Sequence, residues 1–301
     1  MKREFKKLTA EDLHILSRYF SLRPNKTCDS TFLSSYLWKD YYHTRFYLNE
    51  GRAVQWLSEY EGKLSTSIPL CEADQLPYYF RDMQDYMNQE LGMKMTVELA
   101  DEEALQILNL DAGKYEITEQ RDAFDYLYDA DLLRRLPGKK YHKKKNHINA
   151  FLKEYEGRYE YRTLSCQDEE EILEFLNRWR QGKSDDSGHH LEMEYEGITG
   201  VLDQCRGLQV KMAGIRVDGR LEAFTIGSYN RALRMAIIHI EKANPDIRGM
   251  YPFINQQFLA NDFADALLVN REDDMGLPGL RKAKESYYPV EMVKKYTIVQ
   301  K

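Results

Sequence analysis

The sequence predicts an α+β protein made of two similar halves, each a mixed, mostly antiparallel sheet flanked by helices. Its 301 residues are long for one hydrophobic core, because single cores stop growing at roughly 250–300 residues. The hydrophobic content of 43%, with 12% aromatic residues, is typical of a folded globular chain. Each half repeats one expected order of two helices, three strands, helix, strand, helix and strand, which indicates an internal duplication of the fold.

In the first half, Leu13, Leu16 and Phe20 have helical spacing. Turn signals at Glu50-Gly51 and Glu61-Gly62 separate three runs of strand character, which predicts an antiparallel meander. The other elements expected in this half are helices at 31–41, 75–91 and 102–108, strands at 44–49, 53–60, 65–70 and 93–99, and extended chain at 115–128.

In the second half, Asp218-Gly219 lies between two runs of strand character and predicts a tight hairpin. A helix is expected to bury Ile172, Phe175 and Leu176 on one face. The other elements expected in this half are strands at 159–164, 210–217, 221–229, 234–241, 266–271 and 296–299, and helices at 192–205, 251–261 and 278–287.

A basic helix at 136–156 is expected to connect a domain at 1–135 to a domain at 157–301, and we expect the second domain to carry the function. Tyr141, Ile148 and Phe151 fall on one apolar stripe of this helix, which we expect to pack between the domains.

Cations and amides flank that stripe and predict contact with phosphate groups. The residues expected to make this contact are Lys140, Lys144, Lys145, Asn146 and Asn149. A solvated helix end is the alternative explanation for the lysines. The two asparagines favour the functional interpretation, because a purely solvated face gains little from amides.

Charge and cysteine usage narrow the function classes. A net charge of −6 argues against general coating of nucleic acid, so any such contact needs a local basic patch. The four cysteines lack the spacing of a zinc ribbon or a disulfide framework, which indicates reduced thiols and a cytoplasmic protein. Adjacent His189 and His190 lack a third ligand at a recognisable spacing, so no metal site is predicted.

Neither a signal peptide nor a membrane span is expected. Glu11, Asp12 and His14 interrupt any apolar run behind the basic N-terminal residues. No apolar run approaches the ~20 residues that a membrane span needs. Membrane contact, if any, is expected to be peripheral, and the sequence predicts no oligomeric state.

The first candidate for catalysis lies in the expected strand at 234–241. Alternation along the strand puts His239 and Glu241 on one face, where they could serve as general base and orienting group. The alternative is that the two side chains satisfy each other at the edge of the sheet.

The second candidate follows the expected strand at 266–271. The strand ends in polar residues, the chain turns at Gly276, and Pro278 starts a helix with a basic face. Polar groups at the carboxyl end of a strand, facing a basic helix, are typical of a transferase cleft. The residues are Asn270, Arg271, Glu272, Asp273, Asp274, Arg281, Lys284 and Tyr287. Simple pairing of Arg271 and Arg281 with these carboxylates is the alternative.

Three stretches together resemble the C-terminal domain family of lysyl-phosphatidylglycerol synthase (phosphatidylglycerol lysyltransferase). They are the basic helix from Gly138 to Phe151, the strand end from His239 to Ala243, and the run from Asn270 to Tyr287. The resemblance covers nearly the whole chain and implies two tandem GNAT-type acyltransferase domains. Membrane-anchored members transfer an aminoacyl group from tRNA to a lipid, and peptidoglycan-bridge transferases share the tandem fold.

The resemblance also implies a phosphate-bearing donor, either aminoacyl-tRNA or an acyl-CoA, and no required cofactor. Acetyl-CoA enzymes of this fold cradle pyrophosphate with a glycine-rich loop, whereas the equivalent stretch here, 244–250, has one glycine. Arg248 and the helix that follows it could still hold a phosphate.

The sequence therefore predicts a soluble transferase that moves an acyl or aminoacyl group to an amine or hydroxyl acceptor. Glu241, or an acid from Glu272 to Asp274, would take the acceptor proton. Basic residues of both candidate stretches would hold donor phosphates, and Asn146, Asn149 and Asn270 would orient carbonyl groups. The alternative is a non-catalytic module of the same fold that binds RNA, nucleotide or lipid head groups in a basic cleft.

Overall fold

A computed structural model describes residues 3–181 and 188–301. The chain forms two compact units, each assembled from segments far apart in the sequence. Unit 1 contains the chain up to Asp125, Asp273–Arg281 and Met292–Lys301, and unit 2 contains Tyr126–Glu272 and Lys282–Glu291. Within the described residues, no helix has both the length and the apolar character needed to cross a bilayer.

Unit 1 contains two sheets. The first has the antiparallel order β1-β2-β3-β4, built from Lys6–Lys7, Arg45–Asn49, Ala53–Tyr60 and Lys63–Ser65. The second has the order β5-β14-β6, built from Thr96–Asp101, Lys295–Gln300 and Tyr115–Glu119. The last strand of the chain is antiparallel to both of its neighbours, so the C-terminal residues complete a sheet begun nearly 200 residues earlier.

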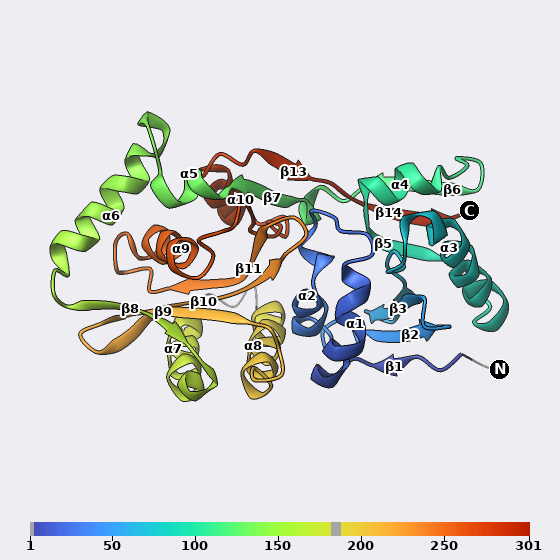
Figure 1. Ribbon diagram of the computed structural model, residues 1–301, viewed down its shortest axis with the longest axis horizontal. Coiled ribbons are helices and arrows are strands. Elements are labelled where there is room, and N and C mark those ends of the chain that lie inside the picture. The colour runs from blue at the N-terminus through green and yellow to red at the C-terminus, as the bar shows by residue number, and fades with distance from the viewer. Residues whose placement is uncertain (1–2, 182–187) are drawn as a thin grey trace. The chain divides into compact units, whose positions relative to one another are not determined.

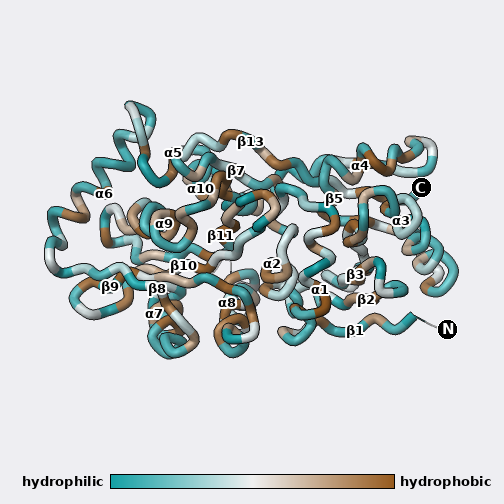
Figure 2. The backbone as a smooth tube through the Cα atoms, in the orientation of Figure 1, coloured by the Kyte–Doolittle hydropathy of each residue, from teal (hydrophilic) through white to brown (hydrophobic). Residues whose placement is uncertain are grey.

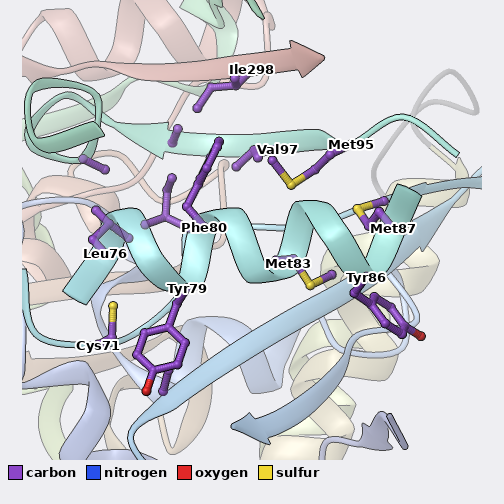
Figure 3. Close-up of a cluster of buried hydrophobic side chains, with 14 of the residues drawn as sticks. Cys71, Leu76, Tyr79, Phe80, Met83, Tyr86, Met87, Met95, Val97 and Ile298 are labelled. Carbon is purple, nitrogen blue, oxygen red and sulfur yellow. The ribbon is translucent and has the colours of Figure 1, made fainter. Parts of the chain in front are cut away.

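The helices of unit 1 bury apolar faces against these sheets. They are α1 (Leu13–Phe20), α2 (Phe32–Leu37), α3 (Leu76–Asp85) and α4 (Glu102–Leu108). Figure 3 shows Leu76, Phe80 and Met83 of α3 in one cluster with Val97 of β5 and Ile298 of β14. The three- and four-residue spacing along α3 puts these side chains on one stripe.

Unit 2 is organised around a seven-stranded sheet of order β13-β7-β12-β11-β10-β9-β8. In that order the strands are Glu291–Val293, Asp125–Asp129, Leu268–Asn270, Met235–Ala243, Arg220–Asn230, Lys211–Val217 and Tyr159–Leu164. The predicted hairpin is confirmed, because Asp218 and Gly219 connect β9 to β10 with φ of 53° and 82°, the left-handed geometry that such turns need. Within this sheet, β11 and β12 are the only strands that pair in parallel among the described pairings.

Helices cover both faces of this sheet. Figure 1 shows α7 (Glu169–Gln181) and α8 (Gly188–Asp203) on one face and α9 (Met250–Asn261) on the other. The remaining helices are α5 (Ala130–Arg135), α6 (His142–Glu154) and α10 (Pro278–Glu285), of which α10 begins in unit 1 and ends in unit 2.

The basic helix α6 packs within unit 2. Figure 2 shows it as mostly hydrophilic, interrupted by a few hydrophobic positions. Ile148 and Phe151 are buried, and the Phe151 and Phe253 ring centroids lie 4.9 Å apart. The apolar stripe predicted for this helix therefore packs on α9 and the sheet of unit 2.

The α+β class and the predicted order of helices and strands are confirmed, with differences in detail. The prediction lacks β1, α5 and β13, which are two, six and three residues long. At 65–70 the strand shrinks to the end of β4 and two isolated bridges, one between Thr66 and Val97 and one between Val54 and Leu70. Short elements carry too little periodicity to be recognised.

The expectation of reduced cysteines is wrong for one pair. Cys166 and Cys205 form a disulfide with their Cα atoms 5.8 Å apart, while Cys28 and Cys71 are buried free thiols. Cys166 precedes α7 and Cys205 follows α8, and these two helices pack together. The pairing depends on that tertiary contact across 39 residues, so spacing could not reveal it.

Candidate active site in unit 2

The candidate site lies where β11 and β12 part. Their parallel pairing ends at Ile237 with Asn270, although β11 continues to Ala243. On the other side of β11, Ile238 pairs with Gly227 and Ile240 with Ile226, so His239 has no partner in the ladder. Such a bulge re-aims side chains and is common beside active sites. Beyond the last pair, polar side chains of the two segments face each other at the carboxyl ends of the strands, a usual place for ligands.

Glu241 and Arg271 bridge this gap. Arg271 Nη2 donates to Glu241 Oε1 at 2.8 Å, and Asn255 Nδ2 of α9 donates to Glu241 Oε2 at 2.8 Å. Both carboxylate oxygens are therefore held in place. Arg271 Nη1 is buried and has no hydrogen-bond acceptor among the described residues. A buried donor without a partner is costly, so it marks a position where a ligand oxygen would be stabilised.

Lys144 of α6 joins the same group. Its Nζ lies 3.9 Å from the centroid of the Tyr287 ring, and Arg271 Cζ lies 4.7 Å from that centroid. Burial, with repulsion from Arg271 and Lys143, lowers the pKa of Lys144 to about 8. Burial also raises the pKa of Tyr287 to about 12. Two cations thus contact one aromatic ring, and a bound anion or polarised carbonyl oxygen would reduce their mutual repulsion.

His239 belongs to a second network. Its Nδ1 lies 2.7 Å from Glu272 Oε1, and its Nε2 lies 2.7 Å from Ser228 Oγ of β10. A carboxylate only accepts, so Nδ1 carries a proton and donates it to Glu272. His239 and Glu241 therefore do not pair with each other. Each bonds to a residue that follows β12.

The turn after β12 positions Glu272 and Arg271, the partners of His239 and Glu241. Glu272 has a φ of 57°, which is unusual for a residue with a side chain, and its backbone N–H donates to Asn270 Oδ1 at 2.7 Å. Lys284 is buried and donates through Nζ to the backbone carbonyl of Arg271. Asn270 and Lys284 thus support the backbone that carries Arg271 and Glu272.

Further cations gather at the start of α9. Burial, with Arg248, Lys143 and Lys144 as neighbouring charges, lowers the pKa of His147. Gly249 caps α9 with a φ of 89°, and a Cβ there would lie 2.2 Å from the His147 carbonyl oxygen. Only glycine allows this approach, which sets basic side chains of α6 beside a helix N-terminus, where anions bind.

Other predicted residues lie on the surface of unit 2. Lys140 Nζ lies 5.0 Å and 5.3 Å from the Tyr141 and Tyr288 ring centroids. Lys145, Asn146 and Asn149 are exposed on α6. They are available to an extended anionic partner.

Three residues of the predicted cluster belong to unit 1. Asp274 is buried and accepts from Arg281 Nε and Nη2, both at 2.9 Å, and it pairs with Arg121 at 3.2 Å. Arg281 also pairs with Asp122 at 2.7 Å, and Asp273 accepts from the backbone N–H of Met275. The carboxylate pairing considered for Arg281 is therefore present, whereas Arg271 pairs with Glu241.

Sequence reasoning missed Ser228 and Asn255. Asn255 is 2% exposed on a helix whose other residues are largely apolar, and a polar residue inside such a run was the available signal. Ser228 gives no comparable signal, because its role depends on the pairing of β10 with β11.

No group of three or more potential metal ligands occurs among residues 3–181 and 188–301. The paired histidines open α8, and the side chain of His189 lies outside the described residues.

Comparison with known proteins identifies the family. The model of "Phosphatidylglycerol lysyltransferase, C-terminal" matches residues 20–299. The chain belongs to this family. The resemblance seen in its three motifs is therefore confirmed.

Solved structures agree on the fold. A conserved protein of unknown function from Bacteroides thetaiotaomicron VPI-5482 matches with a TM-score of 0.91 at 26% identity, covering 99% of this chain and 100% of that one. L-PGS from Bacillus licheniformis matches with a TM-score of 0.69 at 15% identity, covering 98% of this chain and 92% of that one. A tandem GNAT protein from the clavulanic acid biosynthesis pathway matches with a TM-score of 0.51 at 9% identity, covering 99% of this chain and 98% of that one. The tandem GNAT-type fold is thus shown.

A curated relative, an uncharacterised protein of Mycoplasmoides gallisepticum, is 27% identical over 174 residues, or 58% of this chain. The match spans 55% of that relative's length.

Proposed function

We propose that the chain is a transferase that moves an aminoacyl group from aminoacyl-tRNA to an amine or hydroxyl acceptor, with acyl-CoA as the other candidate donor. The observation that carries the proposal is the buried, unpartnered Arg271 Nη1 beside Glu241 and Lys144. Acyl transfer needs a fixed donor for the oxyanion that develops on the carbonyl oxygen. Arg271 supplies such a donor, and Glu241 with Asn255 holds its position.

The proposed step is direct attack. The acceptor nitrogen or oxygen attacks the ester carbonyl carbon, and Glu241 takes its proton. Arg271 stabilises the oxyanion, the bond to the ribose oxygen breaks, and the ammonium of Lys144 protonates that leaving oxygen. A pKa of about 8 suits Lys144 to proton transfer near neutral pH. His239, held by Glu272, is the second candidate base, and its Nε2 is engaged by Ser228.

The surface of α6 favours tRNA over a CoA thioester. Lys139, Lys140, Lys143, Lys144 and Lys145 extend along this helix and the turn before it, and Arg248 lies at the start of α9. This exceeds what one pyrophosphate requires and suits a backbone that carries a charge on every nucleotide. The loop before α9 has a single glycine, which limits the backbone N–H groups available to pyrophosphate.

A thermal-shift comparison tests the donor. We expect aminoacyl-tRNA to raise the unfolding midpoint more than uncharged tRNA does, and acetyl-CoA to leave it unchanged, because ligands stabilise by mass action. A shift with acetyl-CoA or a longer acyl-CoA alone would instead identify a CoA-dependent enzyme.

Single-turnover deacylation then separates an enzyme from a binding module. With labelled aminoacyl-tRNA and a panel of amine and hydroxyl acceptors, the wild-type chain is expected to form an acceptor-linked product. Glu241→Gln is expected to abolish product while keeping tRNA affinity. If the wild-type chain binds tRNA but forms no product with any acceptor, the non-catalytic module is the better description.

A further inference from the structure

A cavity of about 980 Å³ opens within unit 1, and all of its lining residues belong to that unit. This volume is at the upper end of the range for small-molecule sites, roughly 300–1,000 Å³. The cavity is lined by residues of α2, the first sheet and β5. It is separate from every residue used in the transfer chemistry proposed above.

The walls combine aromatic rings with hydroxyl groups. Five aromatic side chains and eight serines or threonines line the cavity. Tyr42 and Tyr60 keep 38% and 39% of their surface exposed, and their ring centroids lie 5.8 Å apart at an interplanar angle of 61°. Trp38 lines the same space. Exposed aromatic faces set at an angle suit the aliphatic body of a ligand and attract a positive charge.

The charges of the lining favour a cation. Four carboxylates face two cations, so acids are in excess by two. Arg23 is neutralised by Asp101 through two hydrogen bonds of 2.7 Å and 2.6 Å, and Lys63 is exposed. Asp29 pairs with the buried Lys295 at 2.8 Å, which leaves Glu98 and Glu61 to set the sign of the cavity.

Glu98 is the lining residue that most clearly favours a cationic ligand. Its Oε2 accepts from Gln120 Nε2 at 2.6 Å and from Thr297 Oγ1 at 2.8 Å, and no described residue forms an ion pair with it. A half-buried carboxylate without a cation gains from a ligand ammonium. The serine and threonine hydroxyl oxygens of the lining can accept from the remaining N–H groups of a primary or secondary ammonium. A quaternary ammonium has no N–H group to donate.

We propose that this cavity is a binding site for a linear aliphatic di- or polyamine, with ammonium groups on the carboxylates and methylene groups on the aromatic walls. Two ammonium groups would balance Glu98 and Glu61. A phosphorylated or carboxylated ligand would meet the same excess of negative charge and be repelled. The site needs no aminoacyl donor, so its test is independent of the transferase proposal.

A matched ligand pair tests the charge requirement. The full chain is titrated by calorimetry at low ionic strength with 1,6-diaminohexane, with 1,6-hexanediol and with spermidine. We expect saturable binding of both amines and none of the diol over the same concentration range. Equal binding of diol and diamine, or no binding of either amine, would overturn the proposal.

Variants locate the site. Glu98→Gln keeps a carbonyl oxygen for Gln120 and Thr297 but removes the charge, and we expect amine affinity to fall about tenfold to a hundredfold. Tyr60→Ala removes an exposed ring, and a loss of about twofold to fivefold is expected. Glu116→Gln, on the exposed face of β6, makes the same charge change outside the cavity and should leave affinity unchanged.

Amine binding that falls equally in Glu98→Gln and Glu116→Gln would show general charge attraction and contradict the assigned site. Unfolding midpoints of the variants establish that they are folded. If Glu98→Gln fails to fold, Tyr60→Ala decides, and unchanged amine affinity in that variant rules the cavity out.

Discussion

The two units use opposite charges in their open polar regions. In unit 2, Arg271 and Lys144 lie near one bonded carboxylate, Glu241, and favour an anionic or carbonyl-bearing ligand. In unit 1, the cavity has an excess of carboxylates and exposed aromatic rings. A duplicated order of elements thus does not fix the chemistry, because the site depends on a few side chains held by the shared scaffold.

The units also bury their charges differently. Arg23 of unit 1 donates both of its amino groups to Asp101 and leaves only its buried Nε without an acceptor, whereas Arg271 of unit 2 has one amino group bound to Glu241 and the other without an acceptor. The pair in unit 1 serves stability, and the second amino group of Arg271 is available to a ligand. Variants that affect one unit and spare the other test this contrast.

The largest expected effect is on turnover in unit 2. Glu241→Gln is expected to lower single-turnover aminoacyl transfer by about a hundredfold to ten-thousandfold, as for loss of a general base. Diamine binding in unit 1 should be unchanged. Glu196→Gln, an exposed carboxylate of α8, is the matched control and should retain full transfer. Equal transfer rates in Glu241→Gln and the control would remove Glu241 from the proposed step.

Much of this architecture could be predicted from sequence, because strands such as β3 and β9 end at the turn residues Glu61-Gly62 and Asp218-Gly219. The residues that give the last motif its identity, from Asn270 to Tyr287, were recognised, yet they divide between the two units. Short-range patterns do not encode where the chain crosses from one compact unit to the other.

The candidate site could be predicted only in part for a related reason. His239, Glu241 and Arg271 were recognised as polar residues at strand ends, but alternation alone suggested that the first two share a role. The bulge opposite Gly227 and Ile226 sends them to different partners. Strand pairing across the sheet decides that geometry, and it also brings Ser228 to His239.

The next largest effect is on the stability of unit 1. Arg23→Met leaves Asp101 buried without its cation, and we expect the free energy of unfolding to fall by about 3–5 kcal/mol. Chemical denaturation measures this loss. Arg52→Met, at an exposed position, should change it by less than about 0.5 kcal/mol. A loss below about 1 kcal/mol for Arg23→Met would contradict a structural role for the pair.

A backbone contact in unit 2 gives a smaller loss. Gly249→Ala places a Cβ 2.2 Å from the His147 carbonyl oxygen, so α6 and α9 must separate, at a cost of about 1–3 kcal/mol beyond the strain of the positive φ. Gly157→Ala is the matched control, because Gly157 has a φ of 69° with no atom within 4 Å of the added carbon. If both variants lose the same stability by denaturation, the close approach is unimportant.

The smallest expected effect concerns Lys144, whose pKa is lowered to about 8. Between pH 8 and the usual lysine range, the unfolded chain holds a proton at this side chain that the folded chain has released, so folding becomes more favourable as pH rises through that window. Labelling by an amine-reactive reagent, read by mass spectrometry, should rise for Lys144 around pH 8 and for the lysine of a model peptide in the same reaction only above it. Burial also slows access of the reagent to Lys144, so we expect the labelling rates of the two lysines near pH 8 to differ by no more than several-fold. Identical pH profiles would show that the cations around Tyr287 do not perturb Lys144, and would remove it as the proposed proton donor while leaving Arg271 and Glu241 in place.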